Sequence, residues 1–307
     1  ANFNISYNRA KIDKLAGGQT WQSSNWGGKP AGQNDFFIEE GGRLGEVYGY
    51  ELDGFYTTDD FSWDGSKWIL NENLTDPTEL IKYNNFGPGS LKLKADEDGK
   101  FTKKRLGNTV PTVTGGFGIN MRYKNFDLSA FFNYSLGNKI VNATKLGSSY
   151  YNDTKKGWNL NDNFTLAKRY SWIDPSTGEN MLKSSYIKSN GLDYTINRLN
   201  EINAGASMYN PGSITEMPLL DWAVEDGSFL RVNNISIGYT LPKVFVNKMF
   251  MQNVRIYVTG YNLYCFTKYS GADPEVDTRR STPMTPGVDY SAYPKSRSFV
   301  GGINVTF

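Results

Sequence analysis

Hydrophobic and polar residues alternate one by one along several stretches of the chain. In residues 116–123, the side chains of Phe117, Ile119, Met121 and Tyr123 fall on one face, and glycine, asparagine and arginine fall on the other. A period of two is the pattern of a β-strand that has one apolar and one polar face. This segment is therefore predicted to be a strand whose two faces meet different surroundings.

A second alternating segment, 126–135, follows directly after the dipeptide Lys124–Asn125. Its apolar side carries Phe126, Leu128, Ala130, Phe132 and Tyr134. Two alternating segments joined by two residues predict an antiparallel hairpin with a tight turn.

The same alternation recurs in the stretches 3–8, 44–56, 234–241, 254–259 and 298–307. It is weakest in 44–56. We therefore expect about seven strands of roughly 8–12 residues, close to the length that a tilted strand needs to cross a bilayer. Strands of soluble proteins average ~5–6 residues. The predicted fold class is all-β, with strands long enough to span a membrane.

The connections between the predicted strands are very unequal in length. The short ones are Lys124–Asn125 and 242–252, and the long ones are 57–113, 138–226 and 265–295. If successive strands run in opposite directions, the long loops all fall on one side, as in outer-membrane barrels. Only the longish segment 14–42 does not fit this arrangement.

Composition narrows the classes of function. The net charge is +2 and histidine is absent, and Cys265 is the one cysteine of the 307 residues. Nothing in this balance attracts nucleic acid, and His-based catalysis and His-ligated zinc are excluded. The mean hydropathy is −0.53, and helical membrane spans are excluded because no stretch approaches ~20 consecutive apolar residues. It does not exclude a barrel, in which only alternate residues of each strand meet lipid.

Both ends of the chain read as strands. Residues 2–8 already alternate, so we expect further sequence before Ala1. The last strand ends on an aromatic residue, and the predicted membrane-insertion signal consists of Phe299, Ile303, Val305 and Phe307. The alternative is the edge strand of a soluble sheet.

Five stretches resemble the SusC/RagA family of TonB-dependent outer-membrane transporters. They are Tyr48-Gly-Tyr-Glu-Leu-Asp-Gly-Phe-Tyr56, the hairpin 115–139, Val224-Glu-Asp-Gly-Ser-Phe-Leu-Arg-Val-Asn-Asn-Ile-Ser-Ile-Gly-Tyr-Thr-Leu-Pro242, the strand 254–264 and the loop 266–276. They follow one another in family order. The resemblance implies that 1–307 is the C-terminal part of a large antiparallel transmembrane barrel, about seven of ~22 strands. The plug domain and the N-terminal strands would be absent from this chain.

The resemblance also implies a function and partners. We expect TonB-dependent import of a nutrient, a glycan oligomer or else a peptide, as the barrel component of a SusCD-type complex and not as an enzyme. The expected partners are a SusD-like surface lipoprotein, TonB through the missing N-terminal region, the remaining strands and plug, and lipid. The expected location is the outer membrane, with the C-terminus at the periplasmic side. The alternatives are a siderophore-type receptor without the lid and a soluble all-β carbohydrate-binding domain.

A set of about seven strands cannot close a wide barrel by itself. Both sheet edges would then be left unpaired in lipid, where each unsatisfied backbone group costs several kcal/mol. The chain is therefore expected to need further strands.

Aromatic residues in the long loop 138–226 are candidates for contact with cargo, because sugars stack their C–H faces on aromatic rings. The predicted substrate-binding residues are Tyr151, Trp158, Arg169, Tyr170 and Trp172. The alternative is that these rings pack the loop or a lid protein, since Tyr and Trp are also enriched at interfaces.

Acidic clusters offer weaker candidates. Asp96 and Asp98 lie in a calcium-loop-like stretch, but Lys94 and Arg105 occupy two expected ligand positions, and calcium takes 6–8 oxygens. We expect an acidic turn there and no cofactor, with any calcium bound elsewhere in the full protein. Asp273, Glu275 and Asp277 could form a glycosidase pair, but a solvated loop is the favoured interpretation.

Three arginines are expected to face the lumen, because a charge on the lipid face at mid-depth costs ~2–4 kcal/mol. They are Arg122, Arg231 and Arg255.

Overall fold

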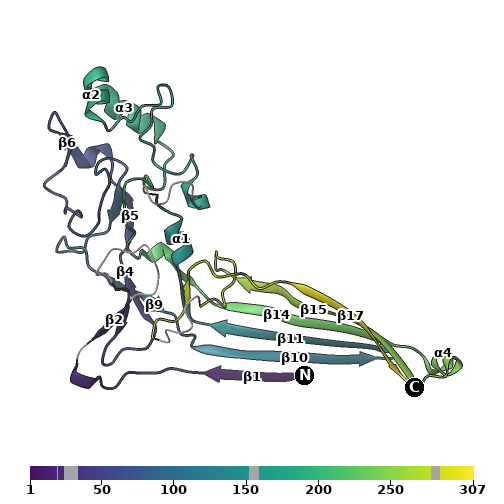
Figure 1. Cartoon of the computed structure of the whole chain (residues 1–307). Coiled ribbons are helices and arrows are strands. Elements are labelled where there is room, and N and C mark those ends of the chain that lie inside the picture. The colour runs from purple at the N-terminus through teal and green to yellow at the C-terminus, as the bar shows by residue number, and fades with distance from the viewer. Residues whose placement is uncertain (19, 24–33, 152–158, 278–283) are drawn as a thin grey trace.

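The computed structural model describes residues 1–18, 20–23, 34–151, 159–277 and 284–307 (Figure 1). The molecule consists of a long antiparallel sheet and a lobe that stands at one end of it. In sheet order the six strands are β1 (Asn2–Tyr7), β10 (Val113–Tyr123), β11 (Phe126–Leu136), β14 (Phe229–Thr240), β15 (Asn253–Thr267) and β17 (Ser298–Thr306). The predicted hairpin is confirmed, because β10 and β11 pair along their whole length across Lys124–Asn125.

One predicted strand is not part of this sheet. The segment 44–56 forms the short strands β4 (Glu46–Gly49) and β5 (Leu52–Phe55) in the lobe, so the sheet has six strands and not about seven. Tyr50 and Tyr56 are buried in two different clusters of the lobe, and Gly54 adopts a left-handed conformation between them. The alternation in this segment therefore reflects packing inside the lobe and not contact with lipid.

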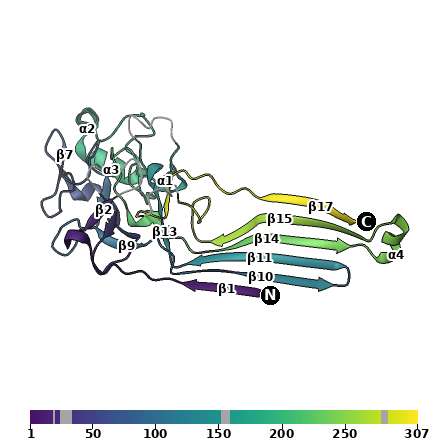
Figure 2. The same ribbon diagram turned by 60° about the horizontal axis from the view of Figure 1, so that its bottom comes forward.

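This correction also accounts for the segment 14–42. Because β1 pairs directly with β10, residues 8–112 form a single connection. The lobe is made of the described parts of this connection and of 137–228 and 268–297, whereas 124–125 and 241–252 lie at the opposite end of the sheet (Figure 2). All long connections are thus on one side, as predicted.

Small sheets and short helices make up the lobe. The first sheet is β2 (Trp21–Ser23), β3 (Phe36–Ile38), β4 and β9 (Lys104–Asn108). Another is β13 (Val224–Asp226), β12 (Lys139–Asn142) and β16 (Val288–Asp289), and two pairs are β5 with β8 (Leu91–Leu93) and β6 (Phe61–Trp63) with β7 (Trp68–Leu70). Among the described residues of the lobe, the helices are α1 (Ala143–Gly147), α2 (Ser184–Asn190), α3 (Leu192–Ile202) and the 3₁₀ turns η1 (Ala16–Gly18), η2 (Thr58–Asp60), η4 (Asp162–Phe164) and η5 (Asp221–Ala223). The far end of the sheet carries α4 (Lys243–Val246) and η6 (Asn247–Met249).

The hydrophobic core lies in the lobe and not under the sheet. One cluster of described residues surrounds Val47, Leu91 and Leu146, and a second surrounds Tyr56 and Met181. The apolar residues of the sheet, including Phe117, Phe132, Ile237 and Ile303, belong to neither cluster. The sheet is therefore not one half of a soluble sandwich.

Candidate functional site: a two-faced sheet and a polar pocket

One face of the sheet is a continuous apolar surface. The strand register places Tyr123, Phe126, Tyr239, Ile256 and Ile303 in one transverse row. The next row toward the lobe contains Met121, Leu128, Ile237 and Val258. Ile237 and Val258 are 55% and 56% exposed. A contiguous apolar surface of this kind is unfavourable in water and is the surface that a membrane strand turns to lipid.

The predicted insertion signal lies on the last strand of this face. Phe299, Ile303 and Val305 pair with Gly260, Ile256 and Val254, and all three side chains are exposed, as is Phe307. Their role in insertion stays a prediction.

The opposite face is polar and carries an ion pair. Arg255 binds Asp127 through two bonds, Nε to Oδ1 at 2.9 Å and Nη2 to Oδ2 at 2.5 Å. Asp127 lies on β11 and Arg255 on β15, so the guanidinium crosses the strand between them at Gly238. A Cβ at that glycine would lie 2.4 Å from Nη2 of Arg255. Arg122 is directly opposite Asp127 on β10, so both arginines lie on the predicted face.

Arg231 reaches the same face for a reason that the sequence pattern does not contain. Plain alternation from Ile235 would place Arg231 on the apolar face, because the two are four residues apart. The register of β14 against β11 instead shifts at Asn233, so that Arg231 pairs with Asn133 on the polar side. A β-bulge thus turns the charge away from lipid.

The buried Arg231 side chain ties the third connection to the sheet. It donates to Asn262 at 2.6 Å and forms ion pairs with Asp273 at 2.5 Å and Glu275 at 2.8 Å. Lys295 also pairs with Glu275, at 2.6 Å. The expected solvated loop is therefore wrong for Asp273, which is buried and held by an arginine.

The structure brings some of the predicted cargo-binding aromatics into the interior of the lobe. The ring of Tyr170 packs edge-on against Phe55, and Trp172 donates its Nε1–H to the carbonyl of Pro88 at 2.7 Å. Both rings belong to the second cluster, in agreement with the packing alternative. Tyr151 is exposed and Arg169 is half-buried, so both can be reached from outside. Trp158 lies outside the described residues.

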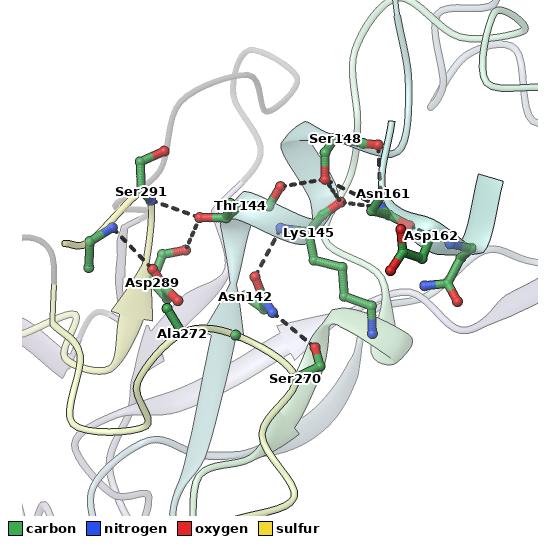
Figure 3. Close-up of a pocket in the computed structure, with 13 residues that line it drawn as sticks. Asn142, Thr144, Lys145, Ser148, Asn161, Asp162, Ser270, Ala272, Asp289 and Ser291 are labelled. Atoms are coloured by element: carbon green, nitrogen blue, oxygen red, sulfur yellow. Dashed lines mark hydrogen bonds between the residues drawn. The ribbon is translucent and has the colours of Figure 1, made fainter. Parts of the chain in front are cut away.

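A polar pocket opens where the second and third connections meet (Figure 3). Its volume is about 480 Å³, and its lining includes Thr144, Ser148, Asp162, Asn163 and Ser291. Hydroxyl, amide and carboxylate groups from η4, α1 and the third connection are thus gathered around one space. Such groups can bond the hydroxyls of a sugar or the backbone amides of a peptide.

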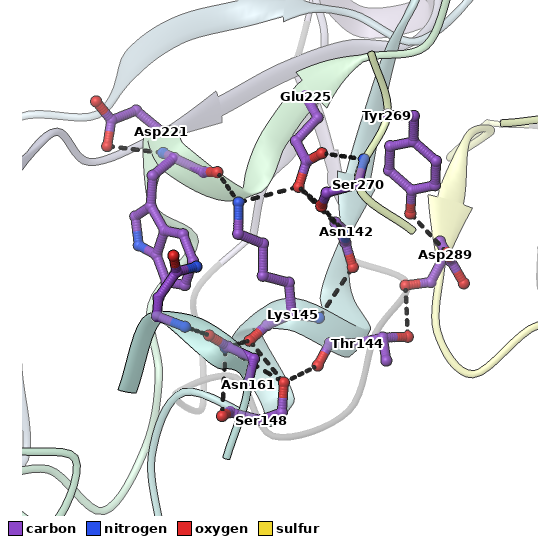
Figure 4. Close-up of polar contacts among 12 residues, drawn as sticks. Asn142, Thr144, Lys145, Ser148, Asn161, Asp221, Glu225, Tyr269, Ser270 and Asp289 are labelled. Carbon is purple, nitrogen blue, oxygen red and sulfur yellow. Dashed lines mark hydrogen bonds and ion pairs between the residues drawn. The ribbon is translucent and has the colours of Figure 1, made fainter. Parts of the chain in front are cut away.

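A network around Lys145 and Glu225 holds this pocket in shape (Figure 4). Nζ of Lys145 donates to Oε1 of Glu225 at 3.0 Å and to the carbonyl of Trp222 at 2.9 Å, and it lies 4.5 Å from the centre of the Trp222 ring. Glu225 also accepts from the backbone N–H and the hydroxyl of Ser270, at 2.8 and 2.7 Å. Burial acts to raise the pKa of the Glu225 carboxyl, but the bonds from Ser270 and Lys145 outweigh it and hold that pKa below its ordinary value.

Asn142 connects the same network to the start of α1. Its Oδ1 accepts from the backbone N–H of Lys145 at 2.9 Å, as an N-cap residue does, and its Nδ2 donates to Glu225 at 3.2 Å. An asparagine that ends a strand and precedes Ala-Thr-Lys is a recognisable capping signal. Its pairing with a carboxylate 83 residues further along has no signal in the sequence.

The acidic stretch around Asp96 forms a hydrogen-bonded turn. Asp96 accepts from the backbone N–H groups of Asp98 and Lys100, at 3.1 and 2.8 Å, and from the hydroxyl of Thr102. The bond from Lys100 is the main cause that lowers the pKa of Asp96. Within the described ranges, no group of three or more His, Cys, Asp or Glu residues could hold a metal ion. The helices in those ranges are all too short or too polar to cross a membrane.

Comparisons with known proteins agree with this architecture. Over 99% of this chain, the sequence is 31% identical to TonB-dependent receptor P3 of Formosa agariphila. Over the whole of this chain, it is 23% identical to TonB-dependent receptor SusC of Bacteroides thetaiotaomicron. Its fold matches the RagAB peptide importer with a TM-score of 0.57 and 21% identity over 99% of the chain and 27% of the matched chain. No protein-family model matches.

The chain is SusC/RagA-like. It covers only 26% of the P3 receptor and 24% of SusC, so it corresponds to about a quarter of such a receptor. The predicted fold class, part of a large transmembrane antiparallel barrel with long loops, is confirmed with six strands. TonB-dependent receptors such as these SusC/RagA-like relatives are outer-membrane proteins. The names of the relatives are those of receptors and importers, in agreement with a non-enzymatic role.

Proposed function

We propose that this chain is the C-terminal part of the barrel wall and outer loops of a TonB-dependent importer. The observation that carries the proposal is the two-faced sheet, with an exposed apolar surface on one side and the Arg255–Asp127 pair on the other. Its outer strands, β1 and β17, each have a partner on one side only among the described residues. Unpaired strand edges do not persist in lipid, so further strands of the receptor continue the sheet on both sides.

The lobe then stands outside the cell and the short turns face the periplasm, with the C-terminus on the periplasmic side. In this arrangement the polar face lines the lumen. The plug domain and the segment that contacts TonB lie upstream of this chain. By the resemblance to the SusC/RagA family, a SusD-like surface lipoprotein is the partner proposed to cover the lobe.

We further propose a glycan oligomer as the cargo. The pocket of Figure 3 has hydroxyl and amide groups, and its lysine, Lys145, is already paired with Glu225, which favours a neutral ligand rich in hydroxyls. Tyr151 and Arg169 remain candidate contacts on the lobe. A peptide is the second candidate, because the matched RagAB structure is named a peptide importer.

Uptake by whole cells tests this function. Deletion of the complete receptor gene should abolish growth on the cognate oligosaccharide, and the intact gene should restore it only in cells that have TonB. If the intact gene restored growth on peptides but not on the oligosaccharide, the cargo would be a peptide and not a glycan. A receptor that purifies without any lipoprotein and restores iron uptake instead would support the siderophore-type alternative. A detergent-free soluble monomer would contradict the importer altogether.

A further inference from the structure

The connection 241–252 packs back onto the end of the sheet. It leaves β14, forms α4 and η6, and enters β15 at the end remote from the lobe (Figure 2). The N–H of Leu241 donates to the carbonyl of Val254 at 2.9 Å, and α4 lies against the start of β15. Val246 on α4 and Val254 on β15 are both buried.

The burial of Val254 shows which face the turn covers. Val254 alternates with Ile256 and Val258 and pairs with Val305, so its side chain belongs to the apolar face. Ile256 and Val258 are exposed on that face, whereas Val254 is covered. The helical turn therefore lies over the rim of the apolar face and not over the polar face.

The outer side of this turn is apolar and lies at the end of the sheet remote from the lobe (Figure 2). Val244, Phe245 and Phe250 are exposed, Phe250 to 93%. Phe250 also adopts a left-handed backbone conformation, with φ of 56°, where a glycine would be less strained. A bulky ring is thus held outward at a strained position.

Charge completes the pattern. Lys243 and Lys248 are exposed on the same short turn, and residues 241–254 contain no acidic side chain. Aromatic residues also mark the end of the neighbouring strands, where Tyr123, Phe126 and Tyr239 form part of one transverse row. Exposed aromatic rings beside lysines are the composition of segments that lie in a membrane interface.

We propose that the α4–η6 turn is an interfacial lipid anchor. Phe245 and Phe250 enter the boundary between headgroups and acyl chains, and Lys243 and Lys248 bind the phosphates of anionic phospholipids. The occupant is lipid because the turn continues the apolar face of the sheet, which is itself the lipid surface. This inference rests on the proposed membrane location of the sheet.

Site-specific labelling of the intact receptor in vesicles tests the anchor. In a background without other cysteines, which includes Cys265→Ser, the variants Phe250→Cys and Val258→Cys each carry an environment-sensitive fluorophore. Val258 reports on the middle of the apolar face, and Tyr293→Cys, at a position of the third connection that is 92% exposed, serves as the aqueous control. Quenching by lipids with brominated acyl chains is compared with quenching by aqueous iodide.

We expect lipid quenching at positions 258 and 250 and iodide quenching only at 293. Iodide quenching at position 250 together with lipid quenching at position 258 would show that the turn lies in water. Shielding of position 250 from both quenchers would show that protein covers the turn. Either result overturns the lipid anchor but leaves the membrane location of the sheet intact. If lipid fails to quench at 258, the membrane location of the sheet fails as well. The two failures are therefore distinguishable.

The lysines are tested with vesicles of phosphatidylcholine alone or mixed with phosphatidylglycerol. We expect the anionic lipid to increase quenching by brominated acyl chains at position 250 about two-fold, and Lys243→Ser combined with Lys248→Ser to remove this difference. Lys82→Ser, at an exposed site in the lobe, is the matched control and should leave it unchanged. An unchanged difference in the double variant would overturn headgroup binding by these lysines.

Discussion

Arg255 reaches Asp127 across an intervening strand, and the passage is open only because residue 238 on that strand is a glycine. The pair therefore fastens three adjacent strands of the polar face rather than two. It places a cation and an anion where the sheet faces away from lipid, and neither charge is left unpaired.

Gly238→Ala should break this arrangement. The new Cβ would lie 2.4–2.6 Å from the guanidinium and the carboxylate, so Arg255 must move, and the free energy of unfolding should fall by about 1–3 kcal/mol. Urea unfolding of the intact receptor, followed by its heat-modifiable gel mobility, measures the loss. Gly301→Ala is the matched control, because its Cβ would meet no atom closer than 3.9 Å. Equal stability of the two variants would contradict the steric explanation.

Asp273→Asn should loosen the third connection from the sheet. Arg231 is almost fully buried, and removal of one partner charge from a buried pair costs roughly 3–5 kcal/mol of stability. Because Glu275 still pairs with Arg231 in this variant, we expect the free energy of unfolding to fall by about 2–3 kcal/mol. Protection of the β15 and β17 amides from hydrogen exchange should fall accordingly. Lys295→Met removes the exposed end of the same network and should cost less than about 1 kcal/mol.

Lys145→Met should destabilise the pocket. Glu225 would keep its bonds from Ser270 but lose its counter-ion while partly buried, at a cost of about 1–3 kcal/mol. The fluorescence of Trp222, which lies beside Nζ of Lys145, reports the local change. The comparison is Lys82→Met, which removes an exposed pair with Glu216 and should change stability by at most about 1 kcal/mol. A loss as large in that control would argue against a special role for the network.

Acid should weaken the α2–α3 region only at very low pH. The hydrogen bond from the Tyr186 hydroxyl, with further bonds from Ser176 and Arg198, lowers the pKa of Asp174 to about 2 from its ordinary 3.8. A lowered folded-state pKa means that the stabilisation is complete above the unfolded value and is lost as the pH falls through about 2. Asp174→Asn should abolish this acid step. Pepsin cleavage of α2–α3 between pH 4 and pH 2 tests it, and identical pH profiles for both proteins would contradict it.

The sequence predicted the sheet well because lipid contact imposes one rule on every strand. Phe117, Phe132, Ile237 and Ile303 follow that rule, and so the strands, their faces and the side of the long loops could be derived from alternation. The rule fails at Asn233, where one extra residue reverses the faces of β14, and no local pattern announces that bulge.

The lobe was less predictable because its interior obeys no period. Tyr170 and Trp172 look like surface rings in a loop, yet they are buried against segments more than 80 residues away, such as the carbonyl of Pro88. Likewise, Lys145 pairs with Glu225, 80 residues further along the same connection, and Asp273 pairs with Arg231 on strand β14. Such contacts depend on tertiary structure, which a reading of local patterns does not contain.

The parallel pairing of β12 with β16 joins the second connection to the third, and the bridges Tyr50–Leu220 and Tyr83–Ile214 join the first to the second. The three connections consequently behave as one inseparable cap. Exchange of a single loop with that of another receptor would disrupt the contacts between this loop and the other two connections. An attempt to transfer selectivity between receptors should therefore move all three connections together, as a cassette inserted above the strands.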